Sequence, residues 1–304
     1  MRRWEPTSGR SEPVAGLPSA DVRAAAGSGW VAAVVDRRPP PVGEEDFAVA
    51  PHLELVDTAS GARVATGPGF SPVWSPDGDE VAWLRPLEPR GCDGEACEGR
   101  VDVAVLDPGA GEPRRALGPG RWALLGWAGD DLLVSDVEDP DHVLLVAPGG
   151  SVETLAMPPS RLWGASPGGQ WLVTVSGSGV EVAPLDGAAV GEARPVRLRA
   201  TALGPGSWSP DGTRLAAVAM RAGRGGVPRA RVVVVAPELR RATEIAGSGG
   251  AAGSVLWSPD GRWVAFARQT GPGGGRLGAV VCRLGGRCRQ LFSWSDDVEL
   301  LRLE

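Results

Sequence analysis

One nine-residue pattern occurs three times in this chain and limits what the chain can fold into. It consists of Trp-Ser-Pro-Asp-Gly, two variable residues and an apolar pair, and its copies begin at Trp74, Trp208 and Trp257. Proline fixes φ at the start of a turn, aspartate can bond its own backbone, and glycine adopts a positive φ without strain. Because apolar residues lie on both sides of the turn, each copy predicts a β-hairpin.

Weaker copies of the pattern complete a series along the chain. Aligned on the turn glycine, the six copies are 40 to 51 residues apart and fall at Gly27, Gly78, Gly129, Gly169, Gly212 and Gly261. A period of about 40–50 residues is typical of a four-stranded propeller blade. We therefore predict an all-β chain, a six-bladed β-propeller of four-stranded antiparallel blades.

The repeat Trp-Ser-Pro-Asp-Gly-x-x-[Val/Leu]-Ala resembles that of TolB-type six-bladed β-propellers. The resemblance extends from about residue 11 to residue 292, with three copies close to the consensus and three degenerate. Because the motif is the turn that builds a blade, it indicates a fold rather than a site. The family includes partner-binding proteins, and similar blades occur as gating domains attached to serine peptidases.

A closed repeat array of 304 residues forms a single domain. We expect the propeller over residues 11–304 and a flexible lead over residues 1–10. Residues 11–24 align with residues 62–75 and predict an outer strand followed by an inner strand. That outer strand could close the ring by joining the last blade. The tryptophans beside the turns are expected to pack between blades, where strands are buried on both faces.

Charge and hydropathy narrow the classes of partner and compartment. A net charge of −6 argues against a nucleic-acid-binding face. No apolar run reaches the ~20 residues of a membrane span. The first residues contain Arg2 and Arg3 but no apolar segment of a signal peptide. We expect either a cytoplasmic protein or an extracytoplasmic one whose leader is missing from this sequence.

The four cysteines favour the extracytoplasmic alternative. Cys92 and Cys97 flank four residues of a predicted b–c loop, and Cys282 and Cys288 flank five residues of a predicted c–d hairpin. Opposite positions in a hairpin lie within disulfide reach. A four-cysteine zinc site is the competing interpretation, but the two connections open on opposite faces of a propeller. We predict two local disulfides, which indicate an oxidising compartment.

The sequence predicts no catalytic residue, metal or cofactor. The only histidines, His52 and His142, have no further metal ligands near them in sequence. Residues 164–168 match Gly-x-Ser-x-Gly, but the nucleophile elbow requires a strand-to-helix turn, and here Ser166 lies on a predicted hairpin. The aspartates of the repeat, Asp77, Asp211 and Asp260, are best explained as turn-capping residues.

The long b–c loops of blades 1, 2, 5 and 6 are therefore the best candidates for function. We expect a monomeric, non-enzymatic propeller that docks a protein or peptide on the face bearing these loops. A propeller hydrolase with a metal at the channel mouth, or the propeller part of a larger sensor or peptidase, are the alternatives. The predicted partner-binding residues are Glu44, Glu45, Asp46, Arg85, Arg90, Arg221 and Arg224.

Overall fold

The fold was analysed in a computed structural model. It describes residues 2–4, 11–13, 22–26, 29–35, 51–88, 99–156, 161–176, 179–198, 202–221, 229–238, 240–258, 260–270 and 276–294. The described residues contain strands and turns and no helix. They form six antiparallel sheets of four or five strands that follow one another along the chain, which is the fold of a six-bladed β-propeller.

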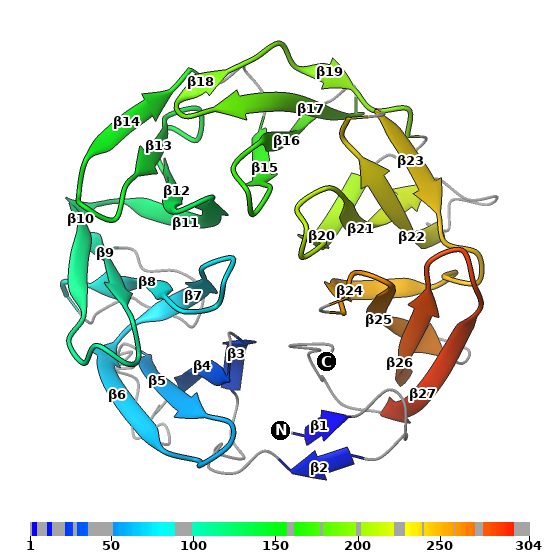
Figure 1. The fold of residues 1–304 in the computed structure, drawn as a ribbon, viewed down its shortest axis with the longest axis horizontal. Helices are drawn as coiled ribbons and strands as arrows, with labels where there is room; N and C mark the ends of the chain where they lie inside the picture. The colour runs from blue at the N-terminus through cyan, green and yellow to red at the C-terminus, as the bar shows by residue number, and fades with distance from the viewer. Residues whose placement is uncertain are drawn as a thin grey trace, which may run out of the picture. The chain divides into compact units, whose positions relative to one another are not determined.

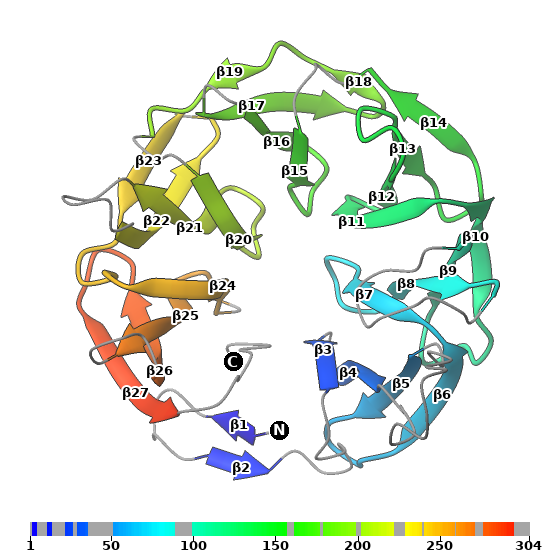
Figure 2. The ribbon, with the colours of Figure 1, turned by 180° about the vertical axis from the view of Figure 1, so that it is seen from behind.

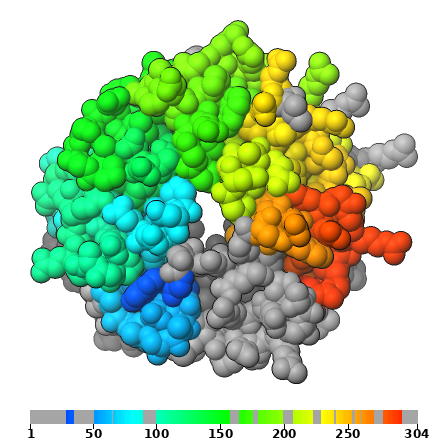
Figure 3. All heavy atoms as spheres, viewed as in Figure 1, coloured from blue at the N-terminus to red at the C-terminus, as the bar shows by residue number. Residues whose placement is uncertain are grey.

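The chain divides into two compact units. The first contains Ser11–Pro159 with Met1–Arg3 and Asp186–Val190, and the second contains Ser160–Leu185 and Gly191–Glu304 with Trp4–Arg10. Strands a to d of each blade follow one another both in sequence and across the sheet, as Figures 1 and 2 show. In the first unit, buried apolar residues of the first three blades, from Ala32 to Val146, form one hydrophobic cluster, and the described residues of these blades pack against one another in Figure 3.

The blades of the first unit contain strands a to d in the following order. Blade 1 is β3 (Val22–Ala26), β4 (Trp30–Val35), β5 (His52–Asp57) and β6 (Arg63–Pro68); blade 2 is β7 (Phe70–Trp74), β8 (Val81–Pro86), β9 (Val101–Leu106) and β10 (Arg114–Gly120); blade 3 is β11 (Trp122–Ala128), β12 (Asp131–Asp136), β13 (Val143–Val146) and β14 (Val152–Leu155).

The remaining three blades repeat this order, and the first of them is irregular. Blade 4 is β15 (Arg161–Ala165), β16 (Trp171–Ser176), β17 (Gly179–Asp186), β18 (Ala189–Val190) and β19 (Arg194–Pro195); blade 5 is β20 (Ala202–Trp208), β21 (Leu215–Arg221), β22 (Arg229–Ala236) and β23 (Arg241–Glu244); blade 6 is β24 (Ala251–Trp257), β25 (Trp263–Thr270), β26 (Arg276–Arg283) and β27 (Cys288–Trp294).

Blade 4 departs from the predicted four strands because its outer strand is split. Both β18 and β19 belong to the edge formed on β17, with β19 opposite Glu181 and Val182. A glycine and a proline interrupt the edge: Gly191 packs against Pro184, so closely that a Cβ would lie 2.6 Å from the ring, and Pro195 has no amide proton to donate. The split therefore follows from residues that cannot continue a regular ladder.

The prediction that an N-terminal strand joins the last blade is wrong. Ser11–Pro13 forms β2 and pairs with β1 (Arg2–Trp4), whereas the last blade is completed by its own fourth strand, β27. Since β27 occupies the free edge of β26, that edge is already paired. β1 also falls within the predicted flexible lead; residues 5–10, like residues 295–304, lie outside the described part.

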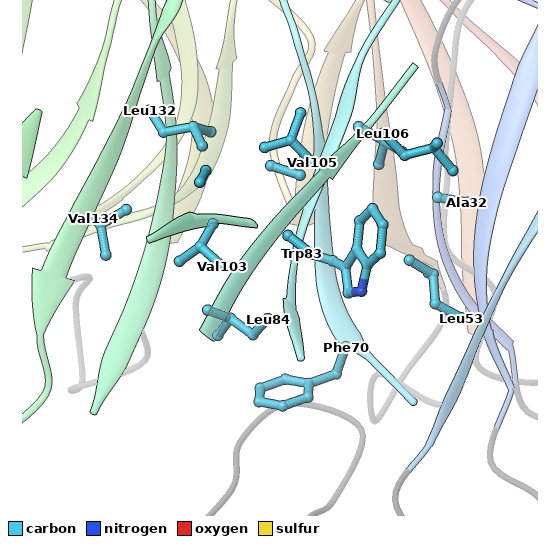
Figure 4. Packing of buried hydrophobic residues seen from close by; sticks show 14 of the residues in the cluster. Ala32, Leu53, Phe70, Trp83, Leu84, Val103, Val105, Leu106, Leu132 and Val134 are labelled. Atoms are coloured by element: carbon cyan, nitrogen blue, oxygen red, sulfur yellow. The ribbon is translucent and has the colours of Figure 1, made fainter. Parts of the chain in front are cut away.

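Blade 2 shows why its strands are apolar on both faces. All six residues of β9 are buried. Trp83 and Leu84, which are adjacent on β8, point to opposite sides of the sheet: Trp83 lies toward Leu53 of blade 1, and Leu84 lies beside Val103 (Figure 4). Trp83 is fully buried, and Gly69 lies so close that a Cβ there would be 2.5 Å from its indole.

The tryptophans of the repeat pack between blades, as predicted. Trp127 Nε1 donates to the carbonyl of Val73, and Trp257 Nε1 donates to the carbonyl of Ser207. Each indole is largely buried and reaches strand a of the preceding blade. The tryptophan before the turn thus joins one blade to its neighbour within a unit.

Candidate functional site

Each blade has two ends with different chemistry. The turn end carries the a–b turns and the c–d hairpins, and the b–c end carries the connection from strand b to strand c. Strand direction places the start of strand a at the b–c end, because neighbouring strands of a blade are antiparallel. A binding site requires a surface whose polar groups are not already bonded within the fold, so the difference between the two ends bears on function.

The turn end is built from a repeated hydrogen-bond unit. In blade 5 the amide of Gly212 donates to the carbonyl of Ser209 at 2.8 Å, and the amide of Ser209 donates to the carbonyl of Arg214 at 2.7 Å. Gly212 has a φ of 67°, which favours glycine. The other described repeat glycines also have positive φ: Gly78, Gly129, Gly169 and Gly261. Gly27 lies outside the described residues.

The serine of the motif has a role that the sequence interpretation missed. Ser209 Oγ accepts a hydrogen bond from the amide of Arg214 at 3.0 Å and donates one to Asp211 Oδ1 at 2.5 Å. Asp211 Oδ1 also accepts the amide of Thr213 at 3.1 Å, so the predicted backbone bond of the aspartate is confirmed. The hydrogen bond from Ser209 is the main cause that holds the pKa of Asp211 below its ordinary value. Two further copies have the same arrangement: Ser75–Asp77 and Ser258–Asp260.

Ser166 is the same cap without an aspartate. Its Oγ accepts the amides of Gln170 at 3.1 Å and Trp171 at 3.0 Å, and the residue is buried. The Gly-x-Ser-x-Gly match is therefore a strand-to-strand turn whose serine holds the backbone. A helix, which a nucleophile elbow would require after the serine, is not found there, because β16 follows.

Successive turns of the second unit pack directly on one another. A Cβ on Gly212 would lie 3.5 Å from the amide nitrogen of Gly168 in the preceding turn. Arg214 donates to the carbonyl of Gly261 at 3.2 Å, and its guanidinium lies 5.1 Å from the centre of the Trp257 ring. Many polar groups at the turn end therefore bond to other groups of the protein and stabilise the fold.

The b–c end of the first unit contains a cavity. It has a volume of about 170 Å³ and lies between blades 2 and 3. Its walls come from the start of strand a in both blades, from β8 and β9, and from the residues after β12; they include Phe70, Leu84, Val101, Trp122, Leu124 and Val137. A cavity of about 150 Å³ accommodates a benzene-sized group. This one can therefore hold one aromatic or branched aliphatic side chain.

Local backbone features shape the wall of this cavity. Ser71 has a φ of 52°, unusual for a residue other than glycine, and lies where the pairing of β7 with β8 shifts register. Trp122 donates from Nε1 to the carbonyl of Gly118 at 2.8 Å and packs on Gly120, where a Cβ would lie 2.2 Å from the indole. The two glycines leave room for the indole, and Trp122 and Ser71 both line the cavity.

The rim of the cavity combines an ion pair with an exposed apolar side chain. Arg121 and Glu138 approach to 2.7 Å with side chains 44% and 64% exposed. Between the two partners in sequence, Val137 is 51% exposed and donates its amide to the carbonyl of Arg121 at 2.8 Å. Leu87, at the end of strand b in blade 2, is also exposed. The b–c end of blades 2 and 3 therefore has both exposed apolar side chains and charged side chains.

The predicted partner-binding residues fall into two groups. Five of them lie outside the described residues: Glu44, Glu45, Asp46, Arg90 and Arg224. Arg85 and Arg221 are described and belong to different units, each at the b–c end of its blade. No sequence pattern indicates the cavity itself, because most of its walls are ordinary apolar strand residues.

Arg85 has a structural partner that the sequence did not predict. Its Nε and Nη2 donate to the two carboxylate oxygens of Asp102 at 2.9 and 2.7 Å, and Arg115 donates to the same carboxylate at 3.0 Å. Asp102 is fully buried, and its hydrogen bond is the main cause that raises the pKa of Arg85. A buried carboxylate requires such compensation.

One predicted disulfide is confirmed. Cys282 and Cys288 are directly opposite each other in β26 and β27, with an S–S distance of 2.04 Å and a Cα–Cα distance of 4.0 Å. Cys92 and Cys97 lie outside the described residues.

Among the residues that are described, no three His, Cys, Asp or Glu side chains come together as a metal site. Within the same part of the chain, no helix is long and apolar enough to cross a membrane.

Comparisons with known proteins agree with the fold. No protein-family model matches the sequence, and no curated protein is significantly similar to it. TolB from Acinetobacter baumannii superposes with a TM-score of 0.55 at 17% identity, covering 86% of this chain and 63% of that one. This chain thus spans less than two thirds of the length of that TolB.

Two peptidase structures are similar to the same extent. A structure from a study of two prolyl endopeptidases has a TM-score of 0.61 at 16% identity, covering 96% of this chain and 46% of that one. The β-propeller domain of the Trilobed protease from Pyrococcus furiosus has a TM-score of 0.60 at 14% identity, covering 88% of this chain and 81% of that one. At such identities the likeness shows the fold.

Proposed function

We propose that the chain is a non-enzymatic, TolB-like repeat propeller that binds a protein or peptide at the b–c end of its blades. The observation that carries this proposal is the apolar cavity between blades 2 and 3, with its exposed rim. Binding sites are concave and mostly apolar, with a few polar groups that fix orientation. In this proposal one apolar side chain of the partner enters the cavity, and Arg121 and Glu138 orient the chain beside it.

The contrast between the ends of the blades supports the choice of surface. At the turn end, the polar groups of the repeat form hydrogen bonds with one another, and the surface consists of short turns that resemble one another. At the b–c end, exposed apolar and charged groups lie beside a cavity. Specific recognition requires a patterned surface, and complementary charge adds to specificity and association rate.

Two exposed valines of blade 3 provide a matched test. Val137 lies at the b–c end and Val152 at the turn end, with exposures of 51% and 44%. A photo-crosslinking amino acid at position 137 is expected to capture one reproducible protein, identified by mass spectrometry, that position 152 does not capture. Capture from position 152 alone, or from neither position, would contradict the proposal.

Filling the cavity provides the second arm of this test. Gly99 lines the cavity, and no atom lies within 4 Å of a Cβ added there, so Gly99→Leu is the variant that fills the cavity. The crosslink from position 137 is expected to disappear in this variant while the melting temperature is maintained. A crosslink that persists would show that the partner does not use the cavity.

We propose that the predicted charged loop residues also contact the partner. Charge reversals such as Glu45→Arg or Arg224→Glu are expected to weaken partner binding and to change its salt dependence, with little change in thermal stability. Reversals that leave binding intact, together with turn-end variants that abolish it in folded protein, would assign the function to the other end.

We also propose that the chain works outside the cytoplasm, since a local disulfide favours an oxidising compartment. The likeness to prolyl endopeptidase covers only 46% of that chain, which favours a propeller within a larger protein as the second candidate. Mass spectrometry of native protein under non-reducing conditions tests the compartment, because four free thiols would contradict it.

A further inference from the structure

Three arginines lie on one face of blade 5 at its b–c end. Arg221 on β21 is directly opposite Arg229 on β22, and Arg231 is two residues farther along β22. Residues that are opposite in a ladder, or two apart along a strand, project to the same side of the sheet. Glu244 on β23 is opposite Val233 and therefore lies on this side as well. We call Arg221, Arg229, Arg231 and Glu244 the blade 5 arginine cluster.

Two of the three arginines contact the carboxylate of the cluster. Arg221 Nη2 lies 2.5 Å from Glu244 Oε1, and Arg231 Nη1 lies 3.6 Å from Glu244 Oε2. The side chains of Arg221 and Arg231 are 41% and 44% exposed, and Arg229 is exposed. The three guanidinium groups thus exceed the carboxylate by two formal charges.

The charge of strands b to d of blade 5, both ends of the blade included, is opposite in sign to that of the whole protein. Residues 215–244 contain six arginines and two glutamates, a net charge of +4, whereas the complete chain has a net charge of −6. Directly opposed like charges in a β-ladder destabilise the pairing, and Arg221 opposite Arg229 is such a pair. Glu244 offsets part of this repulsion through its contact with Arg221, and a bound anion would offset more of it.

We infer that the blade 5 arginine cluster binds the carboxylates of an acidic peptide segment. This inference rests on the proposed peptide-binding function and specifies the chemistry of the partner. Guanidinium groups match carboxylates because they donate two parallel hydrogen bonds in one plane. The arginines come from adjacent strands of a rigid sheet, so that their backbones are fixed before the peptide arrives.

The same charges favour an acidic peptide over a nucleic acid. Binding to nucleic acid typically involves about 6–10 phosphate contacts, supplied by a basic surface. The cluster supplies three arginines, and the protein as a whole is acidic. Two or three glutamates or aspartates in a short segment suit this number of arginines.

Binding of fluorescent octapeptides provides the experiment. A peptide of eight glutamates is expected to bind the wild-type protein with a Kd that rises with salt, whereas a peptide of eight glutamines does not bind. Arg229→Glu is expected to weaken binding of the glutamate peptide at least tenfold, and Arg231→Gln is a milder second variant. Arg241→Glu, which makes the same charge change at the exposed turn end of β23, is the matched control and is expected to change the Kd less than twofold.

Several results would overturn the inference. These are a glutamate peptide that does not bind, equal effects of Arg229→Glu and Arg241→Glu, or a single-stranded DNA octamer that binds as tightly and loses binding in the same variants. Melting temperatures within 2 °C of wild type show that each variant is folded, and Arg231→Gln serves if Arg229→Glu is not. Crosslinking from position 137 is a separate readout, so failure of this inference is distinguishable from failure of the proposed function.

Discussion

Replacement of Ser209 by alanine tests the hydrogen-bond unit that defines each repeat. Ser209 is fully buried, and its Oγ is the acceptor for the amide of Arg214 at 3.0 Å and the donor to Asp211 at 2.5 Å. A buried amide that loses its acceptor costs about 1–3 kcal/mol. Because Asp211 is exposed, water can replace the second bond at little cost. We expect the free energy of unfolding to fall by about 2 kcal/mol at pH 7, measured by urea denaturation.

The pH dependence of this loss identifies its cause. The folded-state pKa of Asp211 is lowered, so this group contributes stability above about pH 4, its ordinary pKa in the unfolded chain, and that contribution is lost as pH falls through the lower folded pKa. Alanine at position 209 removes the main cause of the lowered pKa. The difference in unfolding free energy between wild type and Ser209→Ala should therefore shrink from pH 6 to pH 3.

Two other serines serve as controls for this prediction. Ser166 caps its turn without an aspartate, so Ser166→Ala should destabilise the protein while keeping the wild-type dependence on pH. Ser151 is exposed in the c–d hairpin of blade 3, and Ser151→Ala should change stability by less than about 0.5 kcal/mol. If Ser209→Ala is no more destabilising than Ser151→Ala, the repeat serine does not hold the turn.

Three further changes test packing, charge and covalent linkage. Gly69→Ala should lower the unfolding free energy by about 1–3 kcal/mol in urea denaturation, because the added methyl group meets the indole of Trp83. Arg85→Ala should lower it by about 2–3 kcal/mol in the same assay; loss of one partner of a buried ion pair costs about 3–5 kcal/mol, and Asp102 retains a second arginine. Removal of the Cys282–Cys288 disulfide by paired substitution with serine should cost about 2 kcal/mol, as expected for a short closed loop, and should lower the melting temperature in calorimetry.

Matched control variants distinguish these specific effects from a general loss of stability. Gly99→Ala adds the same methyl group where no atom lies within 4 Å and should leave stability unchanged. Arg121→Ala removes an exposed ion pair and should cost less than about 1 kcal/mol. Equal losses in Gly69→Ala and Gly99→Ala, or in Arg85→Ala and Arg121→Ala, would contradict the packing and burial arguments. A melting temperature that is insensitive to the cysteine substitutions would show that the disulfide does not constrain the unfolded chain.

The number of blades and the order of their strands followed from the sequence because the signal for each is local. A turn such as that of Ser209 and Gly212 is closed by bonds between residues at most five positions apart, so the motif that forms it can be read in the chain. The Cys282–Cys288 hairpin was predictable for the same reason. The N-terminal strand was assigned wrongly because its pairing with an edge distant in the chain leaves no local trace in the sequence; here it pairs with β1, and β27 pairs with β26.

Only the tertiary structure showed the cavity at the b–c end of blades 2 and 3. The cavity has walls from strands of two blades, and apolar residues such as Leu84 and Leu124 carry no mark of facing a void rather than a neighbour. Arg85 was predicted to be a partner-binding residue because it ends a strand beside a long loop, yet its guanidinium lies on a buried carboxylate. Turn-forming bonds are local and leave a trace in the sequence, whereas a cavity or a buried ion pair depends on how strands distant in the chain register and pack.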